Sequence, residues 1–146
     1  MVVTNSAGET RKLGERLAEK LQAGDVILLE GELGAGKSEL ARGVARGLGV
    51  QETVTSPSFT ILNVYESGRT PLYHFDWYRL ESDEELYELG MDEYLGGDGI
   101  ALVEWPDRCP DAVPADCLRI RIRAAGGNTR QIEAEPAGCF RKIILE

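Results

Sequence analysis

A glycine-rich segment that ends in lysine and serine is the part of this sequence whose residue types could do chemistry. Residues 31–38 read Gly-Glu-Leu-Gly-Ala-Gly-Lys-Ser, which fits the phosphate-binding pattern G-x-x-x-x-G-K-[ST]. Glycines let backbone N–H groups close around a phosphate, Lys37 can place a cation on the β- and γ-phosphates, and Ser38 can offer its hydroxyl to Mg²⁺. We therefore expect a nucleotide-phosphate site made by Glu32, Leu33, Gly34, Ala35, Gly36, Lys37 and Ser38.

The flanking sequence supplies the context that such a loop requires. Residues 26–29 are a continuous apolar run, which is typical of a strand buried on both faces in a parallel sheet. After the loop, apolar residues recur at helical spacing over 40–48, and Gly49 is placed to end that helix. A strand that enters the loop and a helix that leaves it predict an α/β fold of the P-loop NTPase kind.

Two further strands are predicted to end in carboxylates, at Asp76 and at Glu104. The carboxyl ends of parallel strands line one crevice, so both acids can reach phosphates held by the loop. We expect Lys37, Asp76 and Glu104 to be the catalytic residues of a nucleotide-hydrolysing site. The sequence leaves open which acid orients the attacking water, and either acid alone could be a surface cap or an ion pair. The guanine-reading signature [NT]-K-x-D is absent, which favours ATP over GTP.

Length, composition and charge narrow the class of protein. The 146 residues fit one domain, 1–146, with 42% hydrophobic and 28% charged residues. A net charge of −9 disfavours direct binding to nucleic acid or to an anionic membrane. No apolar run approaches the ~20 residues of a membrane span, and no secretory signal is found. Three cysteines and one histidine lack zinc-site spacing, so we expect inert thiols and a cytoplasmic location.

The rest of the chain is predicted to alternate between helices and short strands. Ser6 and Glu9 form a capping box that opens a helix over 6–22. The other elements expected are an antiparallel hairpin of 60–66 with 72–76, a helix over 82–89, and strands over 100–104, 117–123, 129–135 and 140–145.

A row of arginines is the clear cationic stripe in the sequence. Arg119, Arg121 and Arg123 alternate with apolar residues, which predicts a solvated strand face. Glu133 and Glu135, on a neighbouring predicted strand, can offset the charge of this row.

Taken together, four segments resemble the TsaE (YjeE) family, the small ATPase component of bacterial tRNA threonylcarbamoyladenosine biosynthesis. Their order and spacing cover roughly residues 4–108, and the last forty residues match only in their short-strand pattern. The segments are Glu9-Thr10 with Leu13-Gly14, the loop 31–38, Val54-Thr55-Ser56-Pro57-Ser58-Phe59-Thr60, and His74-Phe75-Asp76-Trp77-Tyr78-Arg79-Leu80 with Glu104-Trp105-Pro106.

The resemblance implies an α/β domain with a mixed, mainly parallel sheet that takes ATP and Mg²⁺ as cofactors. It implies that Ser38 and Glu104 bind the metal, that Thr10 lies near the adenine, and that 56–59 is a mobile segment. The family commonly has threonine where Ser38 and Ser58 stand, and serine keeps the hydroxyl. The implied partners are the TsaD and TsaB proteins, with the tRNA chemistry in TsaD.

Other readings of the same residues remain open at this stage. A small-molecule kinase is one alternative, but the candidate lid 81–93 has seven acids and no Lys or Arg to shield a phosphoryl group. A nucleotide-dependent binding module with negligible hydrolysis shares every residue, and only a turnover assay separates it. Thr10 could be an ordinary helix residue, Trp105 and Tyr78 core aromatics, and His74 an ordinary strand residue.

Overall fold

Seven strands form one mixed sheet in a computed structural model that describes residues 1–146. The strands are β1 (Val2–Thr4), β2 (Val26–Glu30), β3 (Leu62–Tyr65), β4 (Leu72–Asp76), β5 (Ile100–Glu104), β6 (Cys117–Ala124) and β7 (Arg130–Ala137). The helices are α1 (Ala7–Ala18), α2 (Lys37–Leu48) and α3 (Asp83–Glu88), with single 3₁₀ turns η1 (Met91–Glu93), η2 (Pro106–Arg108) and η3 (Pro110–Ala112). None of these helices is long and apolar enough to cross a membrane.

The strand order is β1-β7-β6-β2-β5-β4-β3, and the four central strands β6, β2, β5 and β4 run parallel. The outer pairs β1 with β7, β7 with β6, and β3 with β4 are antiparallel. This is the mixed, mainly parallel sheet that the sequence predicted. Because β2 pairs with both β5 and β6, the loop that follows β2 lies at the centre of the carboxyl edge of the sheet.

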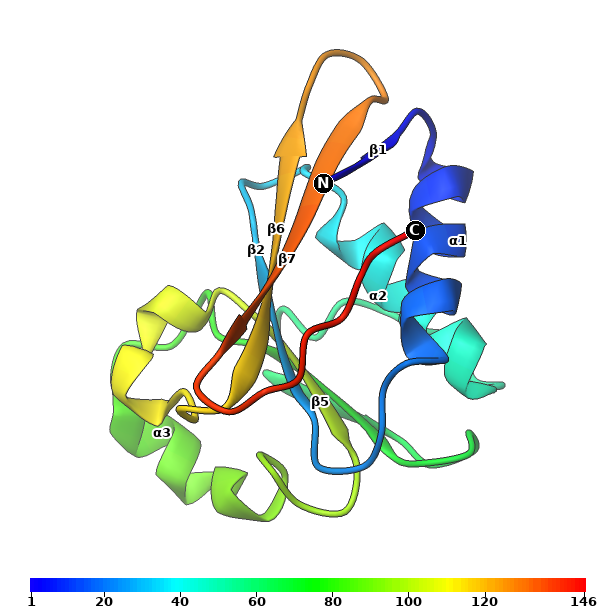
Figure 1. Cartoon of the computed structure of the whole chain (residues 1–146). Coiled ribbons are helices and arrows are strands. Elements are labelled where there is room, and N and C mark those ends of the chain that lie inside the picture. Colours follow the sequence, from blue (N-terminus) through cyan, green and yellow to red (C-terminus); the bar gives the residue numbers. More distant parts are fainter.

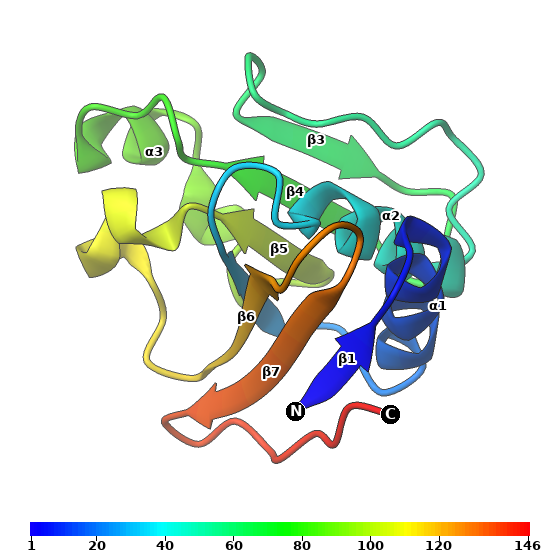
Figure 2. The ribbon, with the colours of Figure 1, turned by 90° about the horizontal axis from the view of Figure 1, so that it is seen from above.

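Helices cover the sheet on both sides (Figures 1 and 2). The apolar run of β2 faces both ways: Ile27 and Leu29 join the core under α1 and α2, whereas Val26 and Leu28 join a second core beneath α3. All four side chains are at most 2% exposed. The prediction that this strand is buried on both faces is confirmed.

The ends of α1 and β3 differ by a few residues from the sequence prediction. Ser6 caps α1 as expected, with its hydroxyl accepting the N–H of Glu9 at 3.1 Å. The helix stops at Ala18 instead of continuing to residue 22, because the next N–H groups bond three residues back in a tightened turn. In the predicted hairpin, Ile61 has a φ of 69°, so β3 begins only at Leu62.

The predicted strand over 140–145 is wrong, and β1 was missed because it has only three residues. β1 already pairs with the outer edge of β7, so no edge of that strand is free for the chain end. The tail instead runs beside α1 (Figure 1), with Ile143 buried against the α1 core. Arg141 anchors it by donating to both oxygens of Asp25, at 3.0 and 2.7 Å.

The three thiols are free, as the sequence indicated. Cys109 and Cys117 are buried, and burial raises the pKa of both, for Cys109 to about 12. Only Cys139 is exposed. The two buried thiols are thus protonated and poorly reactive at neutral pH.

Helices α1 and α2 meet backbone to backbone. A side chain at Gly43 would collide with the main-chain carbonyl of Arg11 on α1. A Cβ at Gly8, in the first turn of α1, would meet nothing closer than 3.8 Å. The contact at Gly43 therefore helps to set the distance between the two helices, together with similar contacts at Gly14 and Gly47.

We expect Gly43→Ala to lower the free energy of unfolding by about 1–3 kcal/mol, because the added methyl group forces the two backbones apart. Gly8→Ala is the matched control, and it is expected to leave stability equal or raised by up to about 1 kcal/mol, since alanine favours the helix. Urea unfolding followed by circular dichroism measures both values. Equal stability of the two variants would contradict the backbone contact.

Candidate functional site

The glycine-rich loop connects β2 to α2 in the conformation that the motif predicts. Gly34 and Gly36 have positive φ angles, 80° and 108°, in the left-handed region that glycine adopts at low cost. Gly36 stands immediately before α2, and no side chain caps that helix start. The first N–H groups of α2 and the positive end of its dipole are therefore left for an anion in the loop.

Lys37 is the first residue of α2, and it is almost fully buried at 5% exposed. Its Nζ donates to the main-chain oxygen of Gly31 at 2.7 Å and lies 3.5 Å from the centre of the Trp105 ring. Burial lowers the pKa of Lys37, and the carboxylates of Glu104 and Asp76 oppose that shift. The structure thus brings the three predicted catalytic residues into one electrostatic cluster.

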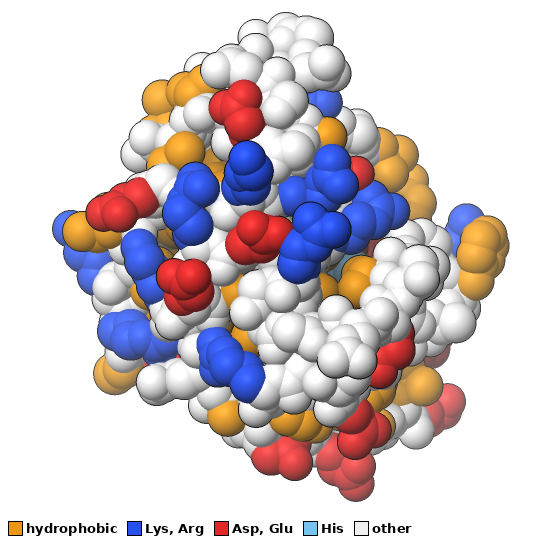
Figure 3. Space-filling model, turned by 90° about the vertical axis from the view of Figure 1, so that its right-hand side faces the viewer, with side chains coloured by type: hydrophobic (Ala, Val, Ile, Leu, Met, Phe, Trp, Pro, Cys, Tyr) orange, Lys and Arg blue, Asp and Glu red, His pale blue; other side chains and the backbone are white.

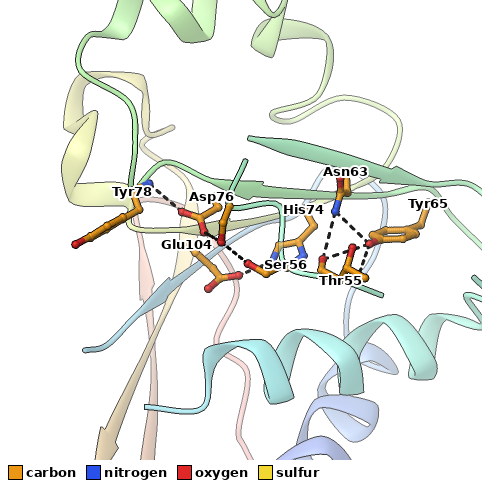
Figure 4. Close-up of polar contacts among 9 residues, drawn as sticks. Thr55, Ser56, Asn63, Tyr65, His74, Asp76, Tyr78 and Glu104 are labelled. Carbon is orange, nitrogen blue, oxygen red and sulfur yellow. Dashed lines mark hydrogen bonds and ion pairs between the residues drawn. The ribbon is translucent and has the colours of Figure 1, made fainter. Parts of the chain in front are cut away.

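The two predicted acids end neighbouring parallel strands. Asp76 and Glu104 are direct partners in the register of β4 and β5, and they are 6% and 4% exposed. Asp76 accepts the N–H of Tyr78 at 2.9 Å (Figure 4), and it accepts the hydroxyl of Ser58 at 3.4 Å. The prediction that both carboxylates lie at one edge of the sheet is confirmed.

His74 is a residue of this site that sequence reasoning set aside as an ordinary strand residue. It does lie on β4, and its side chain is buried, but its Nε2 lies 2.6 Å from Oε2 of Glu104. Figure 4 shows it near Glu104, with Ser56 and Thr55 close to the ring. Residues two apart on a strand share a face, so the spacing of His74 and Asp76 was the available signal.

Aromatic rings continue the site away from Lys37. Trp105 packs on the Tyr78 ring with centroids 4.8 Å apart, and the Arg108 guanidinium lies 5.1 Å from the same tyrosine ring. Neither ring belongs to the core, since Tyr78 is 38% exposed and Trp105 is half-buried. The tryptophan that fills the core is Trp77, at 0% exposed.

A cavity of about 670 Å³ lies beside the loop. It is lined by Leu33, Lys37 and Trp105, and also by three arginines of β6, Arg119, Arg121 and Arg123. These arginines share the β6 face with Cys117, which joins the core on the side away from α1 and α2. The expected solvated strand face is therefore the wall of a cavity.

Two arginines of that wall are paired. Arg119 contacts one oxygen of Glu30, and Arg121 contacts the other at 3.4 Å. Arg121 also donates to Glu135 at 2.8 Å, so Glu135 offsets part of the cationic stripe as expected.

Thr10 does not line this cavity. It is 2% exposed on α1, and its hydroxyl bonds the Thr4 hydroxyl at 2.7 Å and the main-chain oxygen of Ser6 at 3.3 Å. Its implied position near the adenine stays a prediction. Arg130, which sequence reasoning missed, lies against the loop, with its Nη2 donating to the main-chain oxygen of Gly34 at 3.2 Å.

The remaining predicted residues divide between the loop surface and its base. Glu32 and Gly34 are exposed, Leu33 is 71% exposed at the tip, and Ala35 is buried. Ser38 lies with Thr55, Ser56 and His74 around a gap that has no room for a water molecule. The structure has no cluster of three His, Cys, Asp or Glu side chains that could hold a metal. A Mg²⁺ site completed by phosphate oxygens and water needs only one or two protein ligands.

A strand, a glycine loop and a helix that begins with a buried lysine, at the centre of a mainly parallel sheet, define a P-loop NTPase fold. Residues 4–132 match the sequence model of the family described as "Threonylcarbamoyl adenosine biosynthesis protein TsaE". The chain belongs to the TsaE family.

Individual relatives agree with this assignment. The chain is 43% identical over 138 residues to the tRNA threonylcarbamoyladenosine biosynthesis protein TsaE of Bacillus subtilis, covering 94% of this chain and 86% of that protein. It is 40% identical over 130 residues to the protein of the same name from Treponema pallidum, covering 89% and 96%. Among solved structures, the crystal structure of YdiB from Bacillus subtilis matches with a TM-score of 0.80 and 39% identity, over 93% of this chain and 83% of that chain.

The buried ammonium of Lys37 leads to a prediction that separates binding from stability. Because its pKa is lowered, the unfolded chain binds more protons than the folded chain at pH values between the two pKa values of Lys37. Stability therefore rises with pH in that window, and at lower pH the cost of burying the charge is fully present. We expect Lys37→Met, which keeps the apolar stem, to unfold at or above the wild-type midpoint.

The same variant is expected to lose about 10- to 100-fold in nucleotide affinity, the loss that corresponds to a hydrogen bond from a charged group. Calorimetric titration and thermal unfolding give the two quantities. Lys12→Met, at an exposed position on α1, should change neither. Undiminished nucleotide affinity in Lys37→Met would refute a phosphate role for Lys37.

Proposed function

We propose that this chain binds and slowly hydrolyses ATP as a subunit of the machinery that forms threonylcarbamoyladenosine in tRNA. The observation that carries the proposal is the placement of the Lys37 ammonium beside Asp76 and Glu104 at the mouth of a phosphate-binding loop. Membership of the TsaE family supports the role in tRNA modification.

The residues present fit ATP and Mg²⁺. Gly34 and Gly36 leave the loop without side chains where phosphate oxygens would approach, and nothing caps the start of α2. Ser38 and Glu104 supply the hard oxygen ligands that Mg²⁺ prefers. When bound, Mg²⁺ neutralises charge that develops on the β- and γ-phosphates.

We assign different roles to the two acids. Glu104 is the metal ligand, and one of its carboxylate oxygens is in contact with the His74 ring. Asp76 orients the attacking water, since its two oxygens already accept hydrogen bonds from the hydroxyl of Ser58 and the N–H of Tyr78. Lys37 binds the phosphates and must then exchange its bond to Gly31 for the nucleotide.

These roles predict opposite patterns in two variants. Glu104→Ala is expected to weaken Mg²⁺-dependent ATP binding by about tenfold or more, because a metal ligand acts in the ground state and the transition state alike. Asp76→Ala is expected to bind Mg-ATP nearly as wild type and to lower turnover by about 100-fold or more, the scale of a group that acts on the attacking water. Calorimetry and a phosphate-release assay measure both effects. The reverse pattern would exchange the two roles. If the wild-type chain shows no turnover, it is a nucleotide-dependent binding module and not an ATPase.

The surface charge favours protein partners over direct tRNA binding. Basic side chains do gather over α1 and α2, but acidic side chains lie between them (Figure 3). Glu39 pairs with both Arg11 and Arg42, and Glu15 pairs with Arg46. We therefore propose that TsaD and TsaB are the partners and that the tRNA is held by them.

ATP and ADP must change the affinity for these partners differently if the nucleotide is to control the assembly. We expect the TsaD–TsaB pair to be retained by this chain more strongly with a non-hydrolysable ATP analogue than with ADP. A pull-down in each nucleotide state measures this, and a gel shift with the isolated chain tests tRNA directly. Equal retention of the partners in every nucleotide state would contradict control by the nucleotide. Tight tRNA binding by the isolated chain would contradict the proposal that the partners hold the tRNA.

A further inference from the structure

His74 is the only histidine of the chain, and it is buried beside a predicted metal ligand. Its ring nitrogen Nε2 lies 2.6 Å from Oε2 of Glu104, and the two side chains are 2% and 5% exposed. The other ring nitrogen, Nδ1, is buried and has no polar partner. The contact with Glu104 is thus the only hydrogen bond of the ring.

This environment determines where the ring proton lies. An ionised carboxylate only accepts hydrogen bonds, so Nε2 must carry a hydrogen toward Glu104. The 2.6 Å contact therefore makes Nε2 the ring nitrogen that donates to Glu104.

The position of the ring connects the two predicted metal ligands. His74 contacts Glu104 directly, and it lies with Ser38 around a gap that has no room for a water molecule. A glutamate side chain has three rotatable bonds, and a single fixed donor removes much of that freedom. With Oε2 held by His74, Oε1 is left as the oxygen that can turn to a cation.

We propose that His74 is a positioning residue, which holds the Glu104 carboxylate in the orientation that binds the nucleotide-bound metal. This inference rests on the proposed function, because it requires that Glu104 bind the metal. Partners of this kind behind a metal ligand contribute about 10- to 100-fold in metal affinity. A histidine that served only to pack β4 against β5 would have no such effect.

Two amide side chains distinguish positioning from packing. Glutamine can place its Nε2 near the position of the histidine Nε2, whereas asparagine reaches only as far as Nδ1. We expect His74→Asn to bind Mn²⁺, used as the probe for Mg²⁺, about 10- to 100-fold more weakly in the complex with ADP. His74→Gln is expected to recover most of that loss. Electron paramagnetic resonance of free Mn²⁺ measures the affinity, and ADP affinity without metal should stay as in wild type.

The proton assignment is tested on the wild-type chain without any ligand. Long-range ¹H–¹⁵N correlation spectra of a sole histidine contain one imidazole, and we expect them to show a hydrogen on Nε2. A ring without that hydrogen, or wild-type Mn²⁺ affinity in His74→Asn, would overturn the proposal. If the wild type itself binds no Mn²⁺ with ADP while its spectrum shows the hydrogen on Nε2, the proposed function fails instead, and the metal role of His74 with it.

Discussion

One buried positive charge organises the functional edge of this protein. Lys37 lies at the start of α2 with 5% of its surface exposed, and its ammonium needs compensation that water cannot supply there. The Gly31 carbonyl and the Trp105 ring face make the direct contacts, and the carboxylates of Asp76 and Glu104 provide the opposite charge. Each of these groups comes from the carboxyl end of a central strand or from the residue after it, so the charge cluster exists only if the parallel order of the sheet is correct.

The same requirement leads us to expect that a bound nucleotide would change the contacts of Lys37. The Lys37 ammonium donates a hydrogen bond to a main-chain oxygen of its own loop. Phosphate oxygens are better acceptors for an ammonium, so a bound phosphate would draw Lys37 away from that oxygen. Moving the ammonium changes its contact with Trp105, which in turn packs on Tyr78. Tyr78 follows Asp76 by two residues and donates its N–H to it. A series of direct contacts thus joins the phosphate loop to the aromatic pair and to one of the two acids predicted to be catalytic.

Sequence patterns predicted the parts of the fold that depend on local spacing. The apolar run of 26–29, the loop of 31–38 and the acids at the ends of β4 and β5 were all recognisable, because each carries its signal within about ten residues. The contact of His74 with Glu104 was not, since it joins residues thirty apart whose register is set by strand pairing. Arg130 was missed for the same reason: only the β6–β7 hairpin brings it to Gly34. The error at 140–145 shows the limit of apolar patterns, because the same residues can bury Ile143 against a helix as well as in a sheet.

The close approach of α1 and α2 has a mechanical consequence. With no side chain between the backbones at Gly43, the pair contains no soft layer that could absorb a displacement. A displacement of the end of α2 that follows the phosphate loop is therefore passed on to α1 at this contact, so we expect the two helices to move as one body.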